Sequence, residues 1–337
     1  MIPEKMRVVR LKSYQGIDAL EVVEVPTPKP GPGEVLIKVL AAPVNPSDLM
    51  FIREQYGFVK PLPAGVGFEG CGEVVASGPG LPGQLYVGRR VVFGSQGDWG
   101  SWGEYVVTSA QIVIPIARRF EVEQAAMFVV NPMTAWGMVE IAGKEGHRAL
   151  IQNAAASALG KMILALCNDL NLPLINIVRR QEQIDLLQSL GAEHVLNSTH
   201  PDFDNQLKAK AHDLRATLAL DAVSGTLTAR TLSAMPNGSH LILYGSLSNE
   251  AVTADPRDIL FWGKRISGFI LNDWMAEKGV LPLLMALPRI SSSLWEKMDV
   301  KIQGRFSLDG LKDGLRQYER NMTAGKILLL PHASQAD

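Results

Sequence analysis

The stretch Ala149-Leu-Ile-Gln-Asn-Ala-Ala-Ala-Ser-Ala-Leu-Gly160 decides the fold, together with the segment that follows it to Arg180. It predicts an apolar strand, a turn of small residues, and an apolar helix that runs to Leu170. A second apolar strand, Leu174–Val178, follows. A strand–turn–helix–strand unit of this kind directs the free N–H groups of a helix start at a ligand beyond the first strand.

Two arginines at the end of the second strand, Arg179 and Arg180, indicate which ligand this unit binds. A guanidinium pairs well with phosphate oxygens, so two of them suit a phosphate monoester on the ligand. Arginines after a strand also occur as solvated strand ends, and that alternative stays open. Together with the turn, the pair favours NADP(H) as the bound dinucleotide.

The turn of small residues departs from the dinucleotide fingerprint G-x-G-x-x-G. In one registration it reads Ala155-x-Ser157-x-x-Gly160, so only the last glycine remains. That glycine is the one that lets helix and strand pack closely. Alanine and serine are small enough for a pyrophosphate to approach, so the turn still permits binding.

The chain has 337 residues, enough for two domains, and its character changes near Glu123. Before that point, short β segments alternate with Gly/Pro turns, which predicts an irregular, mostly antiparallel, barrel-like domain. The strands expected there are Glu21–Val25, Glu34–Leu40, Gly72–Ala76, Arg90–Phe93 and Glu104–Val107.

After that point, short apolar strands alternate with helices, a pattern typical of a parallel, doubly wound α/β sheet. The expected strands are Ala149–Ile151, Leu174–Val178, His194–Leu196, Leu218–Ala222, His240–Tyr244 and Arg265–Leu271. The expected helices are Lys161–Leu170, Gln181–Leu190, Asp204–Lys210, Thr226–Met235 and Asp255–Trp262. From about Asn272 we expect helices and then the strand Lys326–Leu330, which returns to the first domain. The expected domains are therefore 1–125 with 273–337, and 126–272.

Composition argues against several classes of function. The net charge of -1 and the hydrophobic fraction of 47% give no sign of a nucleic-acid surface. No apolar run approaches the ~18 residues that a membrane span needs, and the start carries no signal-peptide or transit pattern. Cys71 and Cys167 lie in apolar contexts and predict buried thiols. We expect a soluble, cytoplasmic protein without nucleic-acid or membrane partners.

Several short motifs, in order along the chain, resemble a known family. Four of them are similar to the zinc-independent quinone reductase and 2-enoyl thioester reductase branch of the medium-chain dehydrogenase/reductase superfamily. They are Val44–Asp48, Gln55–Gly57, Gly67–Gly70 and Asn131–Trp136. Five others look closest to the NADPH-dependent trans-2-enoyl-CoA/ACP reductases: Ile151–Ala154, Ile175–Arg179, Leu190–Val195, Tyr244–Gly245 and Gly268–Trp274. The resemblance implies a Rossmann domain, a GroES-like catalytic domain and NADPH as cofactor.

The resemblance also implies that the metal of the zinc-dependent relatives is missing. Their ligand positions correspond to Asn45, to Phe68 before Glu69, and to Asn131. Zinc sites use thiolate, imidazole or carboxylate, so none of the three is a credible ligand. The six histidines show no HxxH or HExxH spacing and predict no metal site. Without a Lewis acid, reduction of an alkene conjugated to a carbonyl is favoured over alcohol oxidation, because the acceptor carbon is already electrophilic.

Tyr56 is the candidate catalytic residue. In the enoyl reductases that the chain resembles, a tyrosine followed by glycine holds the role of proton donor or enolate stabiliser. A phenol with its reference pKa of about 10 stays protonated at neutral pH, which suits a donor. The alternative is a tyrosine packed at the base of a loop.

The resemblance implies cofactor contacts from several parts of the chain. Asn131 and Thr134 match positions near the nicotinamide ribose, and Asn45 matches one at the former metal site. Either asparagine could instead cap the helix that follows it. The remaining positions are Ala156, Ser157, Ala158 and Leu159 at the pyrophosphate, Arg179 with Arg180 at the 2′-phosphate, Tyr244, Gly245, Ser246 and Leu247, then Phe269, Ile270 and Leu271, and finally Lys326.

Three functions stay open from the sequence. The first is an NADPH-dependent, zinc-independent reductase that transfers hydride to an activated double bond, most simply a trans-2-enoyl thioester. An NADPH:quinone oxidoreductase is the alternative, and a non-catalytic NADP(H)-binding protein is the third, motivated by the eroded glycine turn. In this superfamily the strand at Arg265–Leu271 commonly pairs with its twin, so a homodimer is expected.

Overall fold

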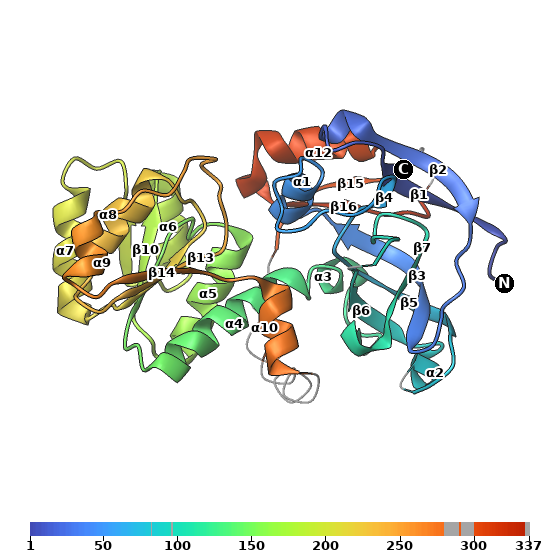
Figure 1. The fold of residues 1–337 in the computed structure, drawn as a ribbon, viewed down its shortest axis with the longest axis horizontal. Helices are drawn as coiled ribbons and strands as arrows, with labels where there is room; N and C mark the ends of the chain where they lie inside the picture. The colour runs from blue at the N-terminus through green and yellow to red at the C-terminus, as the bar shows by residue number, and fades with distance from the viewer. Residues whose placement is uncertain (82, 96, 280–289, 291–299, 334–337) are drawn as a thin grey trace. The chain divides into compact units, whose positions relative to one another are not determined.

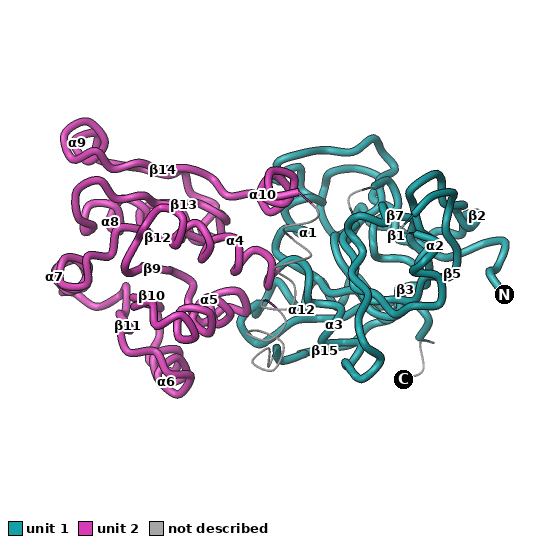
Figure 2. Tube along the Cα trace, turned by 90° about the horizontal axis from the view of Figure 1, so that it is seen from below, with its two compact units in different colours: residues 1–130, 299–337 teal, residues 131–298 magenta. Residues whose placement is uncertain are grey.

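The computed structural model describes residues 1–81, 83–95, 97–279, 290 and 300–333 (Figure 1). Its contacts divide the chain into two compact units (Figure 2). Unit 1 comprises Met1–Val130 and Asp299–Asp337, and unit 2 comprises Asn131–Met298. A compact unit differs from a domain, which is a part of the chain that could fold alone. The expected domains, 1–125 with 273–337 and 126–272, therefore stay a prediction.

Unit 2 is built on a six-stranded parallel sheet in the order β11-β10-β9-β12-β13-β14. The strands are β9 Leu150–Gln152, β10 Leu174–Val178, β11 His194–Asn197, β12 Leu218–Asp221, β13 His240–Leu243 and β14 Arg265–Gly268. The strand order reverses between β9 and β12, which is where doubly wound sheets bind ligands beyond the carboxyl ends of their strands. The predicted fold class is confirmed.

Helices alternate with these strands, as the sequence pattern predicts. They are α4 Val130–Glu145, α5 Ala158–Asp169, α6 Gln181–Ser189, α7 Phe203–Leu214, α8 Thr226–Ala234, α9 Pro256–Leu260 and α10 Leu271–Lys278. Helices α7 and α8 pack together on one side of the sheet, and α5 lies on its other side (Figures 1 and 2). A core that includes Ile151, Ile177 and Leu232 fills the space between the layers.

The strand predicted at Arg265–Leu271 is longer than the one in the structure. Strand β14 ends at Gly268, and Leu271 is already the first residue of α10. Asp273 lies in the first turn of α10, where a carboxylate interacts favourably with the positive end of the helix dipole. The local preference for a helix start therefore ends the strand early.

In the described part of the chain, unit 1 holds two sheets, and its pairing is antiparallel except between β15 and β16. One sheet has the order β15-β16-β3-β5-β6-β8, with β7 also on β3, and the other has the order β2-β1-β4. The strands are β1 Lys5–Leu11, β2 Leu20–Pro26, β3 Glu34–Pro43, β4 Ala64–Gly65, β5 Glu69–Ser77, β6 Arg90–Gly94, β7 Tyr105–Ser109, β8 Val113–Pro115, β15 Ile302–Phe306 and β16 Lys326–Leu329.

The end of the chain returns to unit 1, as predicted. Strand β16 pairs antiparallel with β3, where Leu328 faces Pro43 and Leu329 faces Ala42. Helix α12, Leu311–Arg320, precedes it. The helical prediction for the segment from about Asn272 holds for α10, but residues 280–289 and 291–299 lie outside the described part of the chain.

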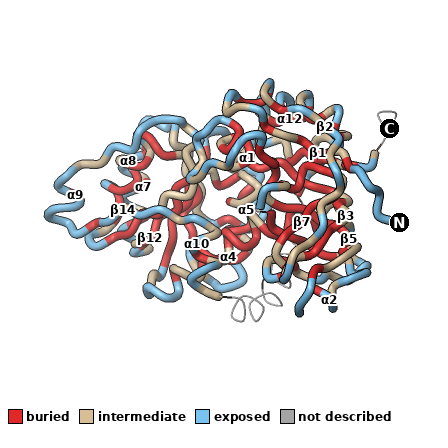
Figure 3. The backbone as a smooth tube through the Cα atoms, turned by 45° about the vertical axis from the view of Figure 1, so that its right-hand side comes forward, coloured by how far each residue is buried: buried red, intermediate tan, exposed pale blue. Residues whose placement is uncertain are grey.

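Burial follows the strands of both units. Figure 3 shows β3, β5 and β12 buried and α9 exposed. Trp102, Phe51 and Phe93 are among the largest fully buried side chains of unit 1. Both cysteines are free and buried, as predicted, and burial raises the pKa of each thiol to about 12, so neither is a reactive thiolate near neutral pH. Over the described residues, no helix is long and apolar enough to cross a membrane.

Candidate active site

The turn after β9 has the geometry that a phosphate-bearing ligand needs. Ser157 is the N-cap of α5, and its Oγ accepts the N–H of Gly160 at 3.0 Å. The N–H groups of Ala158 and Leu159 lie in the first turn, where the helix itself offers no acceptor. The turn therefore presents backbone donors and the positive end of the α5 dipole at the carboxyl end of β9.

Gly160, the one fingerprint glycine that remains, sits where no side chain fits. A Cβ at this position would lie 2.4 Å from the carbonyl oxygen of Ala155 and 2.8 Å from that of Ala154. Both atoms belong to the backbone of the turn, so neither can move aside easily. The glycine therefore lets the first turn of α5 pack closely against the turn that follows β9.

Buried polar side chains hold the turn in place from below. The Asn153 amide donates to Asp221 Oδ1 at 2.5 Å and accepts the N–H of Ala222 at 2.8 Å, which ties β9 to β12. On the other side, Gln152 donates to the carbonyl of Gly160 at 3.0 Å and to Asn176 Oδ1 at 2.7 Å. These hydrogen bonds were not predicted, because a single polar residue in a short apolar strand gives no sequence pattern that indicates its partner.

The two arginines after β10 differ in their surroundings. Both are exposed, and Arg180 Nε lies 3.1 Å from Glu182 Oε1. The N–H of Arg179 donates to Gln183 at 3.1 Å, while its guanidinium has no hydrogen bond or ion pair with any described residue. The Arg179 guanidinium can therefore bind a ligand phosphate without first breaking an interaction with a described residue.

The loop after β13, Tyr244 to Leu247, is partly turned inward. The Tyr244 hydroxyl is buried without a partner among the described residues, and burial raises its pKa. Ser246 Oγ lies 3.2 Å from Ser224 Oγ, and a Cβ at Gly245 would lie 2.8 Å from the carbonyl oxygen of Ala222. Leu247 is exposed. The backbone, Ser246 and Leu247 are thus the parts of this loop that can reach a ligand.

Helix α4 and the segment before α10 carry the other predicted contacts of unit 2. Asn131 follows Val130, the first residue of α4, so it lies within the first turn and is not the N-cap residue. Thr134 is buried one turn further on. Phe269, which precedes Ile270 and Leu271, packs against Trp274 with 6.3 Å between ring centroids. Whether these residues contact a cofactor stays a prediction.

Unit 1 brings Asn45 and Lys326 together in a buried polar cluster. Lys326 Nζ donates to Asn45 Oδ1 and to the carbonyl of Val44, the latter at 3.1 Å. Asn45 Nδ2 in turn donates to Glu69 Oε1 at 2.8 Å. The other carboxylate oxygen of Glu69 accepts two backbone N–H groups, from Val129 at 3.0 Å and from the following residue at 2.8 Å. Asn45 and Lys326 were predicted as separate contacts, and the structure shows one hydrogen-bonded group.

Asn45 also begins helix α1, Pro46–Phe51, at the N-cap position. The backbone N–H of Asn45 donates to Asp48 Oδ2 at 2.7 Å, a capping contact that leaves the Asn45 amide to Glu69 and Lys326. The helix-cap alternative is thus confirmed for the position of Asn45. A contact of its side chain with a cofactor stays a prediction.

Burial favours the uncharged form of each titratable side chain in this cluster. Burial raises the pKa of Asp48 to about 7 and also raises that of Glu69, while it lowers the pKa of Lys326 to about 8. Two carboxyl groups and one ammonium share a site without solvent, so the cluster can hold or release a proton near neutral pH. Asp48 and Glu69 were not predicted as members of this cluster, although the Asn-Pro-Ser-Asp spacing matches a capping box and could have indicated Asp48.

Asp48→Asn should flatten the dependence of stability on pH. The raised pKa means that the folded chain binds more protons than the unfolded chain between about pH 4 and 7. Its stability therefore falls with pH across that window, with a slope of about 1 kcal/mol per pH unit. Asparagine keeps an acceptor for the Asn45 N–H but cannot ionise. Urea unfolding at several pH values checks this: the variant should gain on the original chain up to about pH 7, and parallel curves would contradict the assignment.

Tyr56 lies half-buried in an aromatic cluster of unit 1. Its ring centroid is 5.2 Å from that of Phe58 and 5.1 Å from that of Phe68. Phe68 also contacts Phe51, at 5.7 Å, and immediately precedes Glu69. The ring is packed, as the alternative interpretation proposed. The catalytic role stays a prediction.

Comparison with known proteins gives concordant matches. Two family models match, the zinc-binding dehydrogenase model at residues 158–286 and the alcohol dehydrogenase GroES-like domain model at residues 31–118. The mitochondrial enoyl-[acyl-carrier-protein] reductase of Homo sapiens is 33% identical over 72% of this chain and 65% of its own length, so the chain spans just under two thirds of that relative. The Xenopus tropicalis enzyme of that name is 30% identical over 79% of this chain and 77% of its own.

A solved structure from Mesorhizobium loti, described as a candidate NADPH:quinone reductase, is similar over nearly the whole chain. It is 34% identical, with a TM-score of 0.88 over 98% of this chain and 100% of its own. The curated relatives and the solved structure thus agree on the superfamily and differ in the acceptor that their names give.

Proposed function

Because the chain belongs to the medium-chain dehydrogenase/reductase superfamily, in its branch of quinone and enoyl reductases, we propose that it is an NADPH-dependent reductase of activated double bonds. The substrate we propose is a trans-2-enoyl thioester. One observation carries the proposal: the Ser157-capped start of α5 lies at the strand-order switch, and Arg179 follows the neighbouring strand with its guanidinium unpaired among the described residues.

NADPH supplies the hydride when it is bound. The backbone from Ala156 to Leu159 would hold the pyrophosphate, because it combines small side chains with N–H groups at a helix start. Arg179 would pair with the 2′-phosphate and so select NADPH over NADH. The loop from Tyr244 to Leu247, and the segment from Phe269 to Leu271, would bound the site on either side.

Arg179→Ala should weaken NADPH binding and leave NADH nearly unaffected. A hydrogen bond to a charged group contributes about 1.5–3 kcal/mol, so we expect KM for NADPH to rise roughly 10–100-fold. Arg180→Ala is the matched control, since the Arg180 guanidinium already meets Glu182 and should contribute less. Steady-state kinetics with both dinucleotides measures the ratio. Equal losses in the two variants, or equal losses with NADPH and NADH, would contradict the assignment.

Zinc does not fit the place where the zinc-dependent relatives hold it. Asn45 stands at one ligand position, its amide is bonded to Glu69, and the Lys326 ammonium donates to it. An ammonium group beside the site repels a second cation, and an amide is a poor ligand for zinc. We therefore propose reduction without a metal.

Tyr56 would supply the group that replaces the Lewis acid. Reduction of an enoyl thioester places negative charge on the thioester oxygen, and a hydroxyl aimed at that oxygen stabilises the charge. The aromatic cluster around Tyr56 restricts how its ring can turn. A rigid donor of this kind loses no free energy to reorganisation when the charge develops.

Quinone reduction is the second candidate, supported by the similarity to the Mesorhizobium loti structure. A substrate panel that follows NADPH absorbance separates the two. We expect crotonyl-CoA and longer trans-2-enoyl thioesters to be consumed with the higher kcat/KM. If 1,4-quinones are consumed and enoyl thioesters are not, the chain is a quinone reductase. Tight NADPH binding without turnover of any acceptor would favour a binding protein.

We further propose a homodimer formed through β14. Strand β14 is the last strand of its sheet, so the N–H and C=O groups along one of its edges have no partner strand within that sheet. An edge of this kind can pair with a strand of another chain. Phe261 and Trp262, close before it, are exposed to 71% and 50%. The cytoplasmic location expected from the sequence stays a prediction.

A further inference from the structure

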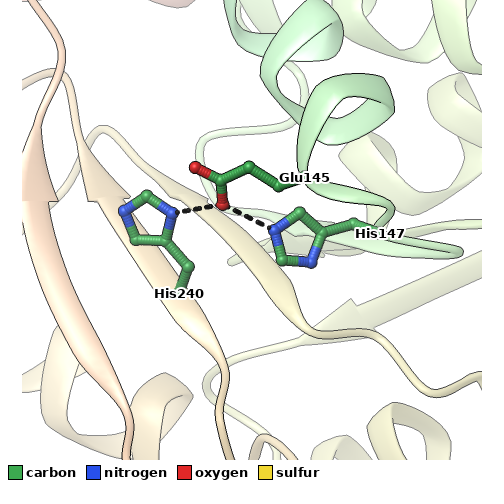
Figure 4. Close-up of side chains that lie close together, drawn as sticks. All are labelled: Glu145, His147 and His240. Carbon is green, nitrogen blue, oxygen red and sulfur yellow. Dashed lines mark hydrogen bonds and ion pairs between the residues drawn. The ribbon is translucent and has the colours of Figure 1, made fainter.

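A second polar cluster lies in unit 2, away from the turn that would hold the cofactor. Glu145 ends α4, His147 follows it closely, and His240 is the first residue of β13 (Figure 4). The turn at Ala156–Leu159 follows the carboxyl end of β9, whereas His240 opens its strand. In a parallel sheet these ends lie at opposite edges, so the cluster is separate from the candidate cofactor site.

The three side chains offer ligand atoms at close range. Glu145 Oε2 lies 3.0 Å from His147 Nε2 and 3.1 Å from His240 Nδ1, and no two of the three atoms are more than 4.8 Å apart. Figure 4 shows this carboxylate oxygen between the two imidazole rings. Tetrahedral zinc, with ligands at about 2.1 Å, holds its ligand atoms roughly 3.4 Å from one another. Small side-chain movements would therefore complete a coordination shell.

The outer ring nitrogens already have partners of the kind found at metal sites. His147 Nδ1 lies 2.8 Å from Thr217 Oγ1, and His240 Nε2 lies 2.7 Å from Ser267 Oγ. A hydroxyl can accept an N–H from the outer nitrogen, and that leaves the inner nitrogen with its lone pair toward Glu145. Metal-binding histidines are usually oriented by an outer hydrogen bond of this type.

Arg265 shows that the centre of the cluster attracts a cation. Its guanidinium donates to Glu145 Oε2 and lies 3.0 Å from His240 Nδ1. His240 Nδ1 also lies 3.1 Å from Glu145 Oε2, and it can donate an N–H to that oxygen or, in the other tautomer, present a lone pair beside it. Arg265 places one positive charge next to the carboxylate and the imidazole.

The side-chain exposures suit exchange of Arg265 for a metal ion. His147 and His240 are only 10% and 8% exposed, whereas Arg265 is 58% exposed and reaches the cluster from outside. Glu145, at 32%, borders solvent. Arg265 can turn into water, and a water molecule can take the open fourth position.

We propose that Glu145, His147 and His240 form a binding site for a divalent transition-metal ion, zinc foremost, from which Arg265 is displaced. Two imidazoles and one carboxylate suit zinc, cobalt or nickel and not magnesium, which prefers oxygen ligands. The ion would fasten the end of α4 to the start of β13. It would add stability to unit 2 and take no part in hydride transfer.

Cobalt(II) titration of the metal-free, full-length chain tests the site. We expect about one equivalent to bind with the intense visible absorption of tetrahedral cobalt, zinc to displace it, and magnesium to have no effect. Zinc should also raise the Tm by a few degrees, because it binds the folded chain preferentially. NADPH oxidation should be unchanged by zinc.

Variants identify the ligands. His147→Gln with His240→Gln should abolish the cobalt spectrum, whereas the matched pair His200→Gln with His212→Gln, exposed residues of the same unit, should keep it. Arg265→Gln removes the competing cation and should tighten cobalt binding about tenfold or more. This variant keeps all three ligands, so its result does not depend on the folding of the histidine variants. The proposal is overturned if the original chain and the Arg265 variant both lack the spectrum, or if the His147/His240 variant retains it.

Discussion

Tyr56→Phe should lower kcat for the reduction of crotonyl-CoA by roughly 10²–10³-fold, with little change in NADPH affinity. The substitution removes one hydroxyl and keeps the ring that packs between Phe58 and Phe68. The expected loss arises because the developing enolate oxygen would face an apolar ring edge instead of a hydrogen-bond donor. Dinucleotide binding should be spared, since in the proposed site the turn at α5 and Arg179 would provide it.

Tyr14→Phe is the matched control for this experiment. Tyr14 belongs to the same aromatic cluster, with its ring 5.8 Å from that of Phe51, but its hydroxyl bonds the backbone of Lys60 at 2.8 Å. That variant should lose some stability and keep most of its turnover. Single-turnover rates and NADPH binding are measured for both variants. Unchanged turnover in Tyr56→Phe would remove this residue from the proposed role, and equal losses in both would assign the effect to packing.

The sequence specified the dinucleotide half of the molecule well, because its signals are local. A parallel strand that is buried on both faces has a sequence of short, continuous apolar character. Strand β10 was predicted at Leu174–Val178, and the structure has it with those bounds. Helix α5 was expected at Lys161–Leu170 but begins three residues earlier, at Ala158, directly after its Ser157 cap. Strand β1 was missed, since the alternation in Lys5–Leu11 includes charged residues and resembles an ordinary polar start.

The polar clusters could not be predicted in the same way, because they form from residues far apart in the chain. Lys326 contacts Asn45 because β16 pairs with β3, and no local sequence pattern near either residue predicts that contact. The histidines were judged by HxxH spacing, which finds ligands on a single helix. His147 and His240 approach each other through the order of the sheet, so that test could not detect them.

Lys326→Met should destabilise the chain by about 3–5 kcal/mol near pH 7, the largest effect on stability that we expect of a single substitution. Lys326 lies beside two buried carboxyl groups, those of Asp48 and Glu69, and its charge holds their pKa values down. Methionine has a similar length and no charge, so the packing is retained and the carboxylates lose their compensation.

The loss of stability in the Lys326→Met variant should grow as the pH rises. Without the ammonium, the pKa of each carboxyl group rises further, and the folded chain takes up protons that the unfolded chain does not hold. The penalty is therefore smallest near pH 5, where the carboxyls of the folded variant are protonated, and grows as the pH rises through their folded values. Urea unfolding at pH 5, 6, 7 and 8 measures it against the original chain. A pH-independent loss would mean that Lys326 acts through packing alone.

The double variant Lys326→Met with Glu69→Gln should recover most of the lost stability. The introduced glutamine would still accept the N–H groups of Val129 and Val130 through its carbonyl oxygen, and its amide could donate to a flipped Asn45 side chain. The double variant then lacks the ammonium group and one of the two carboxyl groups, and such replacements of a buried ion pair are often neutral for stability. Glu69→Gln alone should not do this, because the Lys326 ammonium would compete with that amide for Asn45 Oδ1. The double-mutant cycle thus separates coupling through charge from two independent losses, which would simply add.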